Sequence, residues 1–132
     1  MMRPLALSLL TLAAPALAAE TGEEVEVTAG AVTGLSCALE AQRSGDFAVL
    51  SACPLSEAGE HIVVFDVAEK QIYRFSTKKV FRFELEKAFG GGSVDFSGKV
   101  VSVDKKTGVA TVDVAEYSIT RKPKPGAFKG CL

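Results

Sequence analysis

Two of the three cysteines and the only histidine lie within one stretch of the chain, GLSCALEAQRSGDFAVLSACPLSEAGEH, which covers residues 34–61. Cys37, Cys53 and His61 are of the types that bind zinc or copper(I), and a thiol beside an imidazole can also act as a nucleophile. Their spacing matches no standard metal motif, because the chain contains neither C-x-x-C nor H-x-x-x-H. Two such cysteines more usually form a disulfide. A metal site built from these scattered residues is the alternative that the sequence leaves open.

A disulfide between Cys37 and Cys53 is the expectation in an oxidising compartment. It would close a loop and stabilise the fold by about 3 kcal/mol, because it restricts the unfolded chain. Cys131 then remains, one residue from the carboxyl end. It is free, pairs with one of the upstream cysteines, or links two chains into a dimer, and the sequence leaves these alternatives open.

The first 18 residues have the pattern of a secretory signal peptide. Arg3 supplies a positive charge, residues 5–12 are apolar, and the segment ALA that ends at Ala18 has the small residues that signal peptidases recognise. The apolar run is shorter than the roughly 20 residues of a membrane-spanning helix, and Pro15 interrupts it. We therefore expect cleavage after Ala18, with cleavage after Ala19 as the alternative, and a periplasmic or secreted product without a membrane span.

The predicted organisation is a signal peptide over residues 1–18, one domain over 19–120 and a basic tail with prolines and glycines over 121–132. Removal of the signal peptide takes away one of the 15 basic residues and none of the 16 acidic ones, so the net charge becomes about −2. This balance gives no reason to expect nucleic acid as a partner. The tail could bind an anionic surface or could simply be solvated. Its basic residues are Arg121, Lys122, Lys124 and Lys129.

Patterns of apolar residues predict three strands in the first part of the domain. Residues 24–34 alternate between apolar and polar, and Gly30 within them allows a bend or a close backbone approach. The apolar members of this alternation are Val25, Val27, Ala29 and Ala31. Residues 61–68 are almost entirely apolar, which predicts a strand covered on both faces. After a two-residue turn, residues 71–77 form the third predicted strand.

A helix is predicted over residues 79–89, because Phe81, Leu85 and Phe89 recur at the spacing i, i+4, i+8. Phe81, Phe83 and Leu85 also alternate with charged residues, so an extended start of this segment is the alternative.

Two further strands, 93–103 and 109–119, flank a loop at 104–108 whose Asp, Thr and Gly residues suit a hairpin. Gly98 in the first of them predicts a β-bulge. The sequence thus predicts a mostly β fold, a five-stranded OB-like barrel with one short helix between strands 3 and 4.

Several of these segments resemble a class of small exported bacterial OB-fold-like proteins of unknown function, which carry cysteines in the connection after the first strand. The matching segments are VTGLSC at 32–37, Cys53, EKAF at 86–89 and VDFSGKVVSVDKKTGVATV at 94–112. The resemblance implies the same barrel and an exported location. Residue 40, where such relatives often have a second cysteine close to the first, is glutamate here. This difference weakens any metal role that the resemblance implies.

Small barrels bind ligands on a β face, and the candidate face here carries aromatic and basic residues. The candidate ligand-binding residues are Tyr73, Arg74 and Phe75 on the third strand and Lys99 on the fourth. Packing of Tyr73 and Phe75 in the core is the alternative. No catalytic group or cofactor is indicated, so we expect a non-enzymatic binding or structural module of the cell envelope. Its partner would be an envelope component, an oligosaccharide or a protein. A cysteine-based metal-handling or thiol redox protein is the alternative function.

Overall fold

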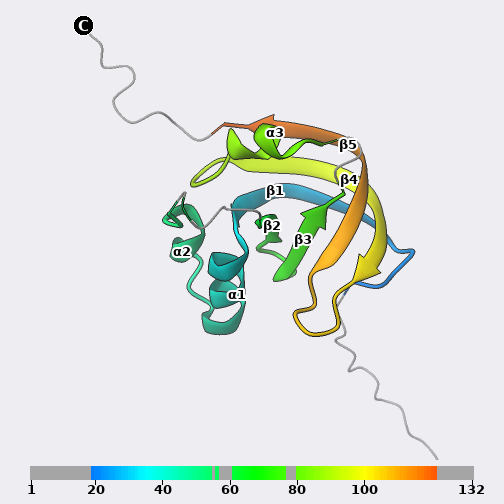
Figure 1. Ribbon diagram of the computed structural model, residues 1–132, viewed down its shortest axis with the longest axis horizontal. Helices are drawn as coiled ribbons and strands as arrows, with labels where there is room; N and C mark the ends of the chain where they lie inside the picture. The colour runs from blue at the N-terminus through cyan, green and yellow to red at the C-terminus, as the bar shows by residue number, and fades with distance from the viewer. Residues whose placement is uncertain (1–18, 55, 57–60, 77–79, 122–132) are drawn as a thin grey trace, which may run out of the picture.

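The computed structural model describes residues 19–54, 56, 61–76 and 80–121 (Figure 1). The predicted signal peptide, the predicted tail beyond Arg121 and its cysteine lie outside the described residues. The elements, in chain order, are β1 (Glu24–Gly34), α1 (Leu35–Ser44), α2 (Ala48–Ser51), β2 (Ile62–Asp66), β3 (Gln71–Phe75), α3 (Arg82–Glu86), β4 (Ser93–Val103) and β5 (Ala110–Thr120).

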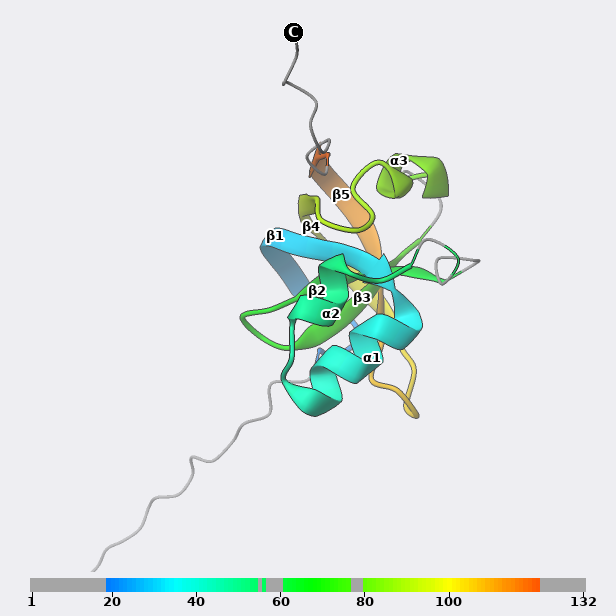
Figure 2. The same cartoon turned by 90° about the vertical axis from the view of Figure 1, so that its left-hand side faces the viewer.

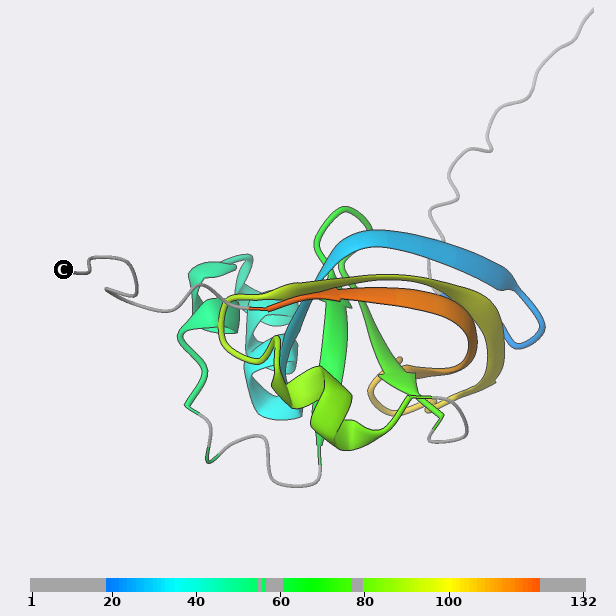
Figure 3. The ribbon, with the colours of Figure 1, turned by 90° about the horizontal axis from the view of Figure 1, so that it is seen from above.

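The five strands form a closed barrel in the order β1-β2-β3-β5-β4. β1 pairs antiparallel with both β2 and β4, and β3 runs parallel to β5, which closes the barrel. Seen from above, β4 and β5 curve together along one side (Figure 3). The predicted mostly β fold and five-stranded OB-like barrel are confirmed, and a helix, α3, lies between β3 and β4.

β1 covers the predicted residues, but its two halves turn different faces toward the core. The pairing with β4 shifts between Val27 and Gly30, and Ala29 has a positive φ of 57°. The predicted alternation is therefore wrong beyond Val27, since Ala29 is exposed whereas Gly30 and Val32 are buried. Gly30 permits this close approach, because a Cβ at this position would overlap the side chain of Val64.

The bulge predicted at Gly98 is confirmed, since the pairing of β4 with β5 shifts between Ser97 and Gly98. A Cβ at Gly98 would lie 2.8 Å from Cγ1 of Val112 and 2.9 Å from Cα of Val114. The absence of a side chain thus brings the backbones of two long strands close together where they bend around the barrel.

The helix between β3 and β4 is shorter than predicted. Residue 79 lies outside the described residues, and Phe81 still has extended backbone (φ −82°, ψ 154°). The chain leaves the helical path after Glu86 and continues in turns. Leu85 and Phe89 are buried as the predicted stripe requires, but Phe81 is exposed, because a helix this short does not carry it around to the core.

The connection after β1 contains two helices, α1 and α2, that were not predicted. The fully buried residues of α1 are the small Ala38 and Ala41, and its larger apolar residues, Leu35 and Leu39, are only partly buried, so the apolar stripe of this helix is weak. Figure 2 shows both helices in front of β2 and β3. They form a layer on the outside of the barrel.

The buried side chains accordingly fall into two layers. Inside the barrel, Val64 of β2 packs in one cluster with residues from all the other strands. Outside it, Val63, Phe65 and Ile72 pack with Ala38 and Leu50 of the two helices. β2 is therefore covered on both faces, as its apolar sequence predicts.

Candidate functional site

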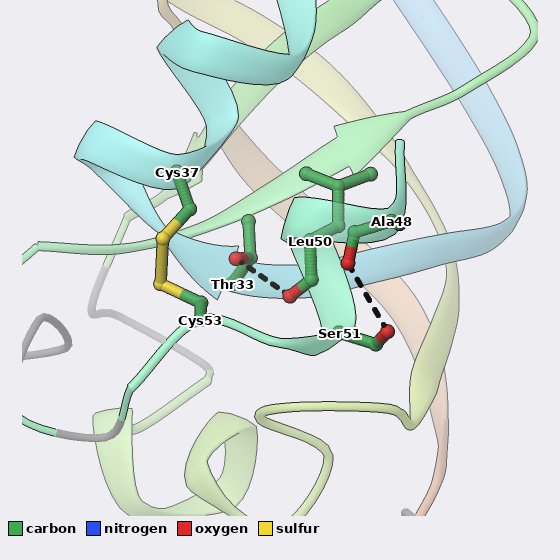
Figure 4. Close-up of a disulfide and its surroundings, with 6 residues drawn as sticks. All are labelled: Thr33, Cys37, Ala48, Leu50, Ser51 and Cys53. Atoms are coloured by element: carbon green, nitrogen blue, oxygen red, sulfur yellow. Dashed lines mark hydrogen bonds between the residues drawn. A yellow bond between two sulfur atoms is a disulfide. The ribbon is translucent and has the colours of Figure 1, made fainter. Parts of the chain in front are cut away.

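The two cysteines of the connection form a disulfide (Figure 4). Cys37 lies on α1 and Cys53 follows α2, with an S–S distance of 2.13 Å and Cα atoms 6.0 Å apart. Cys53 is buried, at 6% exposure. Beside the bond, Oγ1 of the buried Thr33 on β1 donates a hydrogen bond to the carbonyl oxygen of Leu50 at 2.9 Å. The disulfide ties α1 to the segment after α2, and the hydrogen bond ties the same helical layer to β1.

His61 and the two cysteines do not form a group of metal ligands among the described residues. The side chain of His61 is exposed, and the carbonyl oxygen of this residue accepts a hydrogen bond from the backbone N–H of Leu35 at 2.9 Å. Within the described part of the chain, no three His, Cys, Asp or Glu residues are grouped so that they could hold a metal ion. The sulfurs of Cys37 and Cys53 are bonded to each other.

The outer face of β2 and β3, where OB-folds commonly bind oligonucleotides and oligosaccharides, is covered in this protein. Val63, Phe65 and Ile72 on that face are fully buried by the helical layer. The ring of Phe47, between α1 and α2, packs against Phe65 with centroids 5.6 Å apart. A ligand could reach this face only if the disulfide-bonded helices moved away.

The four predicted ligand-binding residues do not share one surface. Tyr73 and Phe75 point into the barrel, where both rings meet Phe96 edge-on, with centroids 5.5 Å and 4.6 Å away. Arg74 lies between them in β3 and faces outward, half-buried, while Lys99 is exposed on β4. The two aromatic residues thus belong to the core, and the two basic residues lie on the outside of different strands.

An exposed pair of aromatic rings lies instead at α3. Phe81 and Phe83 are each 57% exposed, and their rings stack nearly parallel, with centroids 5.9 Å apart and an angle of 10° between the planes. Nζ of Lys87 lies 5.9 Å from the centroid of the Phe83 ring, near the limit for a cation–π contact. The helical periodicity assigned Phe81 to the core, so the sequence analysis missed this pair.

The charged residues around the aromatic pair neutralise one another. Arg82 Nε lies 3.3 Å from Oε2 of Glu86, and Lys87 Nζ lies 3.5 Å from Oε1 of Glu84. The partners of each pair are about one helical turn apart, within α3 or at its end, and largely accessible to solvent, so each pair contributes little to stability. The result is an apolar centre with a rim of paired charges, which we call the α3 patch.

At the end of the barrel near the start of β1, carboxylates surround a pocket of about 520 Å³, here called the acidic pocket. Its acidic lining residues are Glu20, Glu23, Glu24, Glu26, Asp66 and Glu69. None of the other described residues that line it is Lys, Arg or His; they are Ala19, Val25, Gln71 and Tyr73.

Tyr73 reaches this pocket from inside the barrel and is only 5% exposed. Burial raises the pKa of its phenol to about 12, and the negative charges of Asp66, Glu23 and Glu69 add to this effect. The phenol is therefore neutral at physiological pH and able to donate a hydrogen bond.

Searches among protein families, curated proteins and solved structures found no match to this chain. Among the described residues, no helix is both long and apolar enough to cross a membrane. The surfaces described above are therefore the basis on which a function can be inferred.

Proposed function

We propose that this protein is an exported, non-enzymatic binding module of the cell envelope, and that it contacts a protein partner through the α3 patch. The observation that carries the proposal is the exposure of Phe81 and Phe83, 57% each, as a stacked pair. The Cys37–Cys53 bond supports the exported location, because disulfides persist in oxidising compartments.

Exposure of these two rings is unfavourable for the isolated protein. Full burial of a phenylalanine side chain is worth about 1.5–3 kcal/mol, so each ring loses a substantial part of that energy while it faces water. Exposed apolar groups that gather in a patch with a polar rim are typical of interaction sites. A partner that covers both rings would recover this energy.

The surroundings of the pair favour a protein partner over an oligosaccharide. Sugar sites combine an aromatic face with polar groups that bind the hydroxyls, but the charged groups of α3 are already engaged in two ion pairs. An aromatic centre within a rim of charged residues is the usual composition of a protein–protein contact. In such contacts a few central aromatic residues supply most of the binding energy.

The test places a photoreactive phenylalanine analogue at position 83 and, as the control, at Val101, which is 48% exposed on β4. We expect one protein adduct that is specific to position 83 in cells that export the protein. The purified partner should then bind a Phe81→Ser/Phe83→Ser variant at least about 30-fold more weakly, since two central aromatic residues are removed.

The control variant is Val101→Ser, which should bind the partner as the unmodified protein does. Equal adducts at positions 83 and 101, or an unchanged Kd for the double serine variant, would exclude the α3 patch as the contact. Loss of binding to an envelope polysaccharide in the double variant would instead assign the patch to an oligosaccharide.

For the alternative thiol-based function, the relevant observation is that Cys53 is buried, at 6% exposure, and Cys37 is half-buried. Thiol–disulfide exchange requires access of an attacking thiolate to one of the sulfurs. A structural role for the bond is therefore the proposal that the geometry supports better.

A further inference from the structure

Ala19 lines the acidic pocket, and its backbone nitrogen has a defined partner there. Ala19 is 8% exposed, and its N–H donates a hydrogen bond to Oε1 of Gln71 at 3.2 Å. Gln71 is itself buried, and its Nε2 donates to the carbonyl oxygens of Ile72 and Gly108 at 2.9 Å and 2.8 Å. Because both ends of this amide group are engaged, Gln71 presents its oxygen to Ala19 in a defined orientation.

The segment that follows Ala19 is also held in place. Gly22 N–H donates to the carbonyl oxygen of Val100 at 2.8 Å, and Val100 N–H donates to the carbonyl oxygen of Glu23 at 2.9 Å. The backbone N–H of Glu20 donates to Oε1 of Glu23 at 2.9 Å. The nitrogen of Ala19 is therefore a fixed part of the pocket wall.

The charges around this nitrogen are unbalanced. Six carboxylates reach the pocket from the segment before β1, from β1 itself, from the end of β2 and from the turn before β3. The basic residue on β4 in this region is Lys99, which pairs in register with Glu24. Like charges gathered around one space repel one another, and a cation within the space would relieve the repulsion.

Tyr73 is a second and independent sign of a missing partner. The side chain lines the acidic pocket at 5% exposure, and its hydroxyl makes no hydrogen bond to any other described residue. Buried hydroxyl groups normally have such a partner. The pocket thus offers a neutral phenol, an amide oxygen and several carboxylates, which together suit a primary ammonium group.

We infer that the acidic pocket binds the α-ammonium group of Ala19. This group forms when the bond between Ala18 and Ala19 is cleaved. In that hydrolysis the C–N bond breaks, water supplies the hydroxyl group to the carbonyl carbon of Ala18, and the nitrogen of Ala19 becomes an amine. The amine takes up a proton at neutral pH. The nitrogen of Ala19, which has one N–H donor in the peptide bond, then has three N–H donors and a full positive charge near the carboxylates.

This inference rests on the export step of the proposed function, but not on the α3 patch. It requires cleavage after Ala18, which is one of the two positions that the signal peptide pattern allows. It follows that removal of the signal peptide completes an ion-binding site and stabilises the barrel.

The pH dependence follows from the charged and titratable groups that line the acidic pocket. These are Glu20 and Glu23 before β1, Glu24 and Glu26 of β1, Asp66 of β2, Glu69 of the turn and Tyr73 of β3, with Lys99 of β4 opposite Glu24 in register. The carboxylates outnumber the one lysine and favour the ammonium form, so the pKa of the amine should lie above its usual value. A raised pKa gives stability that is complete below the pKa of the unfolded chain and is lost as the pH rises through the folded pKa.

The experiment compares residues 19–132 with a free α-amine and the same chain with an acetylated amine. This chain contains the whole described barrel and both of its apolar clusters. We expect the free amine to raise Tm by about 4 °C at pH 7 and to lose this advantage by about pH 10. The rate of acylation of the amine, followed by mass spectrometry across the same pH range, should give a pKa above the usual value of an α-amine.

Two double variants with the same change in net charge distinguish the effect of the pocket carboxylates from that of the overall charge of the protein. Glu23→Gln/Glu69→Gln removes two carboxylates from the pocket, and Asp113→Asn/Glu116→Gln removes two from β5, outside it. The pocket variant should lower the pKa of the amine, and the β5 variant should leave it nearly unchanged. A pKa at or below 8 in the unmodified chain, or equal Tm values for the free and acetylated forms, would overturn the inference.

The mass of the exported protein supplies the remaining test. A mature chain that begins at Ala19 supports the inference, and one that begins elsewhere overturns it. Because these measurements involve neither Phe81 nor Phe83, their failure is distinguishable from failure of the proposed partner site.

Discussion

Gly98 and Tyr73 are two positions at which the packing of the barrel restricts the side chain. Gly98 is required by the backbone of the neighbouring strand, because the nearest atoms include the carbonyl oxygen of Asp113 and Cα of Val114, which cannot rotate away. The ring of Tyr73 packs on Phe96 in the core, whereas its side chain also lines the acidic pocket. The two residues therefore predict different outcomes on substitution.

Replacement of Gly98 by alanine should destabilise the protein by about 2 kcal/mol, because the added Cβ must push β4 away from β5. Chemical denaturation would measure the change. Ser102→Ala, an exposed position of the same strand, is the matched control and should change the free energy of unfolding by less than about 0.5 kcal/mol. Equal stability of the two variants would show that β4 can shift freely.

Replacement of Tyr73 by phenylalanine should change the alkaline stability of the protein. The folded pKa of about 12 lies above the usual value of 10, so ionisation of the phenol favours the unfolded chain between pH 10 and 12. The stability that Tyr73 contributes is complete below pH 10, and up to about 2 kcal/mol of it should be lost by pH 12. Denaturation across this range should show a smaller loss for Tyr73→Phe, with Tyr117→Phe on the exposed surface of β5 as the control.

At the scale of elements, the helical layer distinguishes this barrel from one with an open β2–β3 face. The strands could be predicted because their apolar alternation and their glycines are local features, and β4 was predicted with its bounds correct. α1 was missed because its fully buried residues, Ala38 and Ala41, are small and its Leu35 and Leu39 are only partly buried. The apolar sequence of β2 predicts that both of its faces are covered, but it does not show that α1 and α2 cover the outer one.

Loss of the disulfide should release this layer before the barrel itself. A Cys37→Ser/Cys53→Ser variant should lose about 3 kcal/mol of stability and bind more of a dye that reports exposed apolar surface. Uncovering Val63, Phe65 and Ile72 is the physical reason. Cys131→Ser, which leaves the bond intact, is the control. A double variant with full stability and no added dye binding would show that packing alone holds the helices.

Across the whole molecule, the barrel is closed by pairings of very different length. β4 and β5 pair along almost their entire length, from Ser93 to Val103 on β4, whereas β3 and β5 pair only over Tyr73–Phe75 and in parallel. Parallel pairing is slightly less stable for each residue than antiparallel pairing. The seam between β3 and β5 is therefore the place where the barrel should open first.

Amide hydrogen exchange can locate this opening. We expect the amides of β3 that face β5 to exchange faster than those in the centre of β4, because a local opening of the seam costs less than separation of β4 from β5. Uniform protection of all five strands would show that the barrel opens only in global unfolding. Peptides that cover Gln71–Phe75 and Ser93–Val103 provide the comparison.

Of the candidate sites, the sequence predicted those that depend on neighbouring residues and missed those that depend on the folded structure. The disulfide was predicted, because two cysteines on one connection of a chain with a predicted signal peptide usually bond to each other. The α3 patch was not, since periodicity assigns Phe81 to a buried stripe and cannot show that the helix begins only after Phe81. The acidic pocket joins residues from the start of β1 to others more than 40 positions away, and only the closed barrel brings them together.

The Cys37–Cys53 bond also makes the stability of the fold depend on the redox potential around it. When the two thiols are reduced, the free energy of unfolding is about 3 kcal/mol lower. The population of the unfolded state should then be roughly a hundred times higher. A newly made chain in reducing surroundings is thus much easier to unfold, to thread through a narrow channel or to digest. Oxidation of the two thiols restores this stability and so lowers the population of the unfolded state.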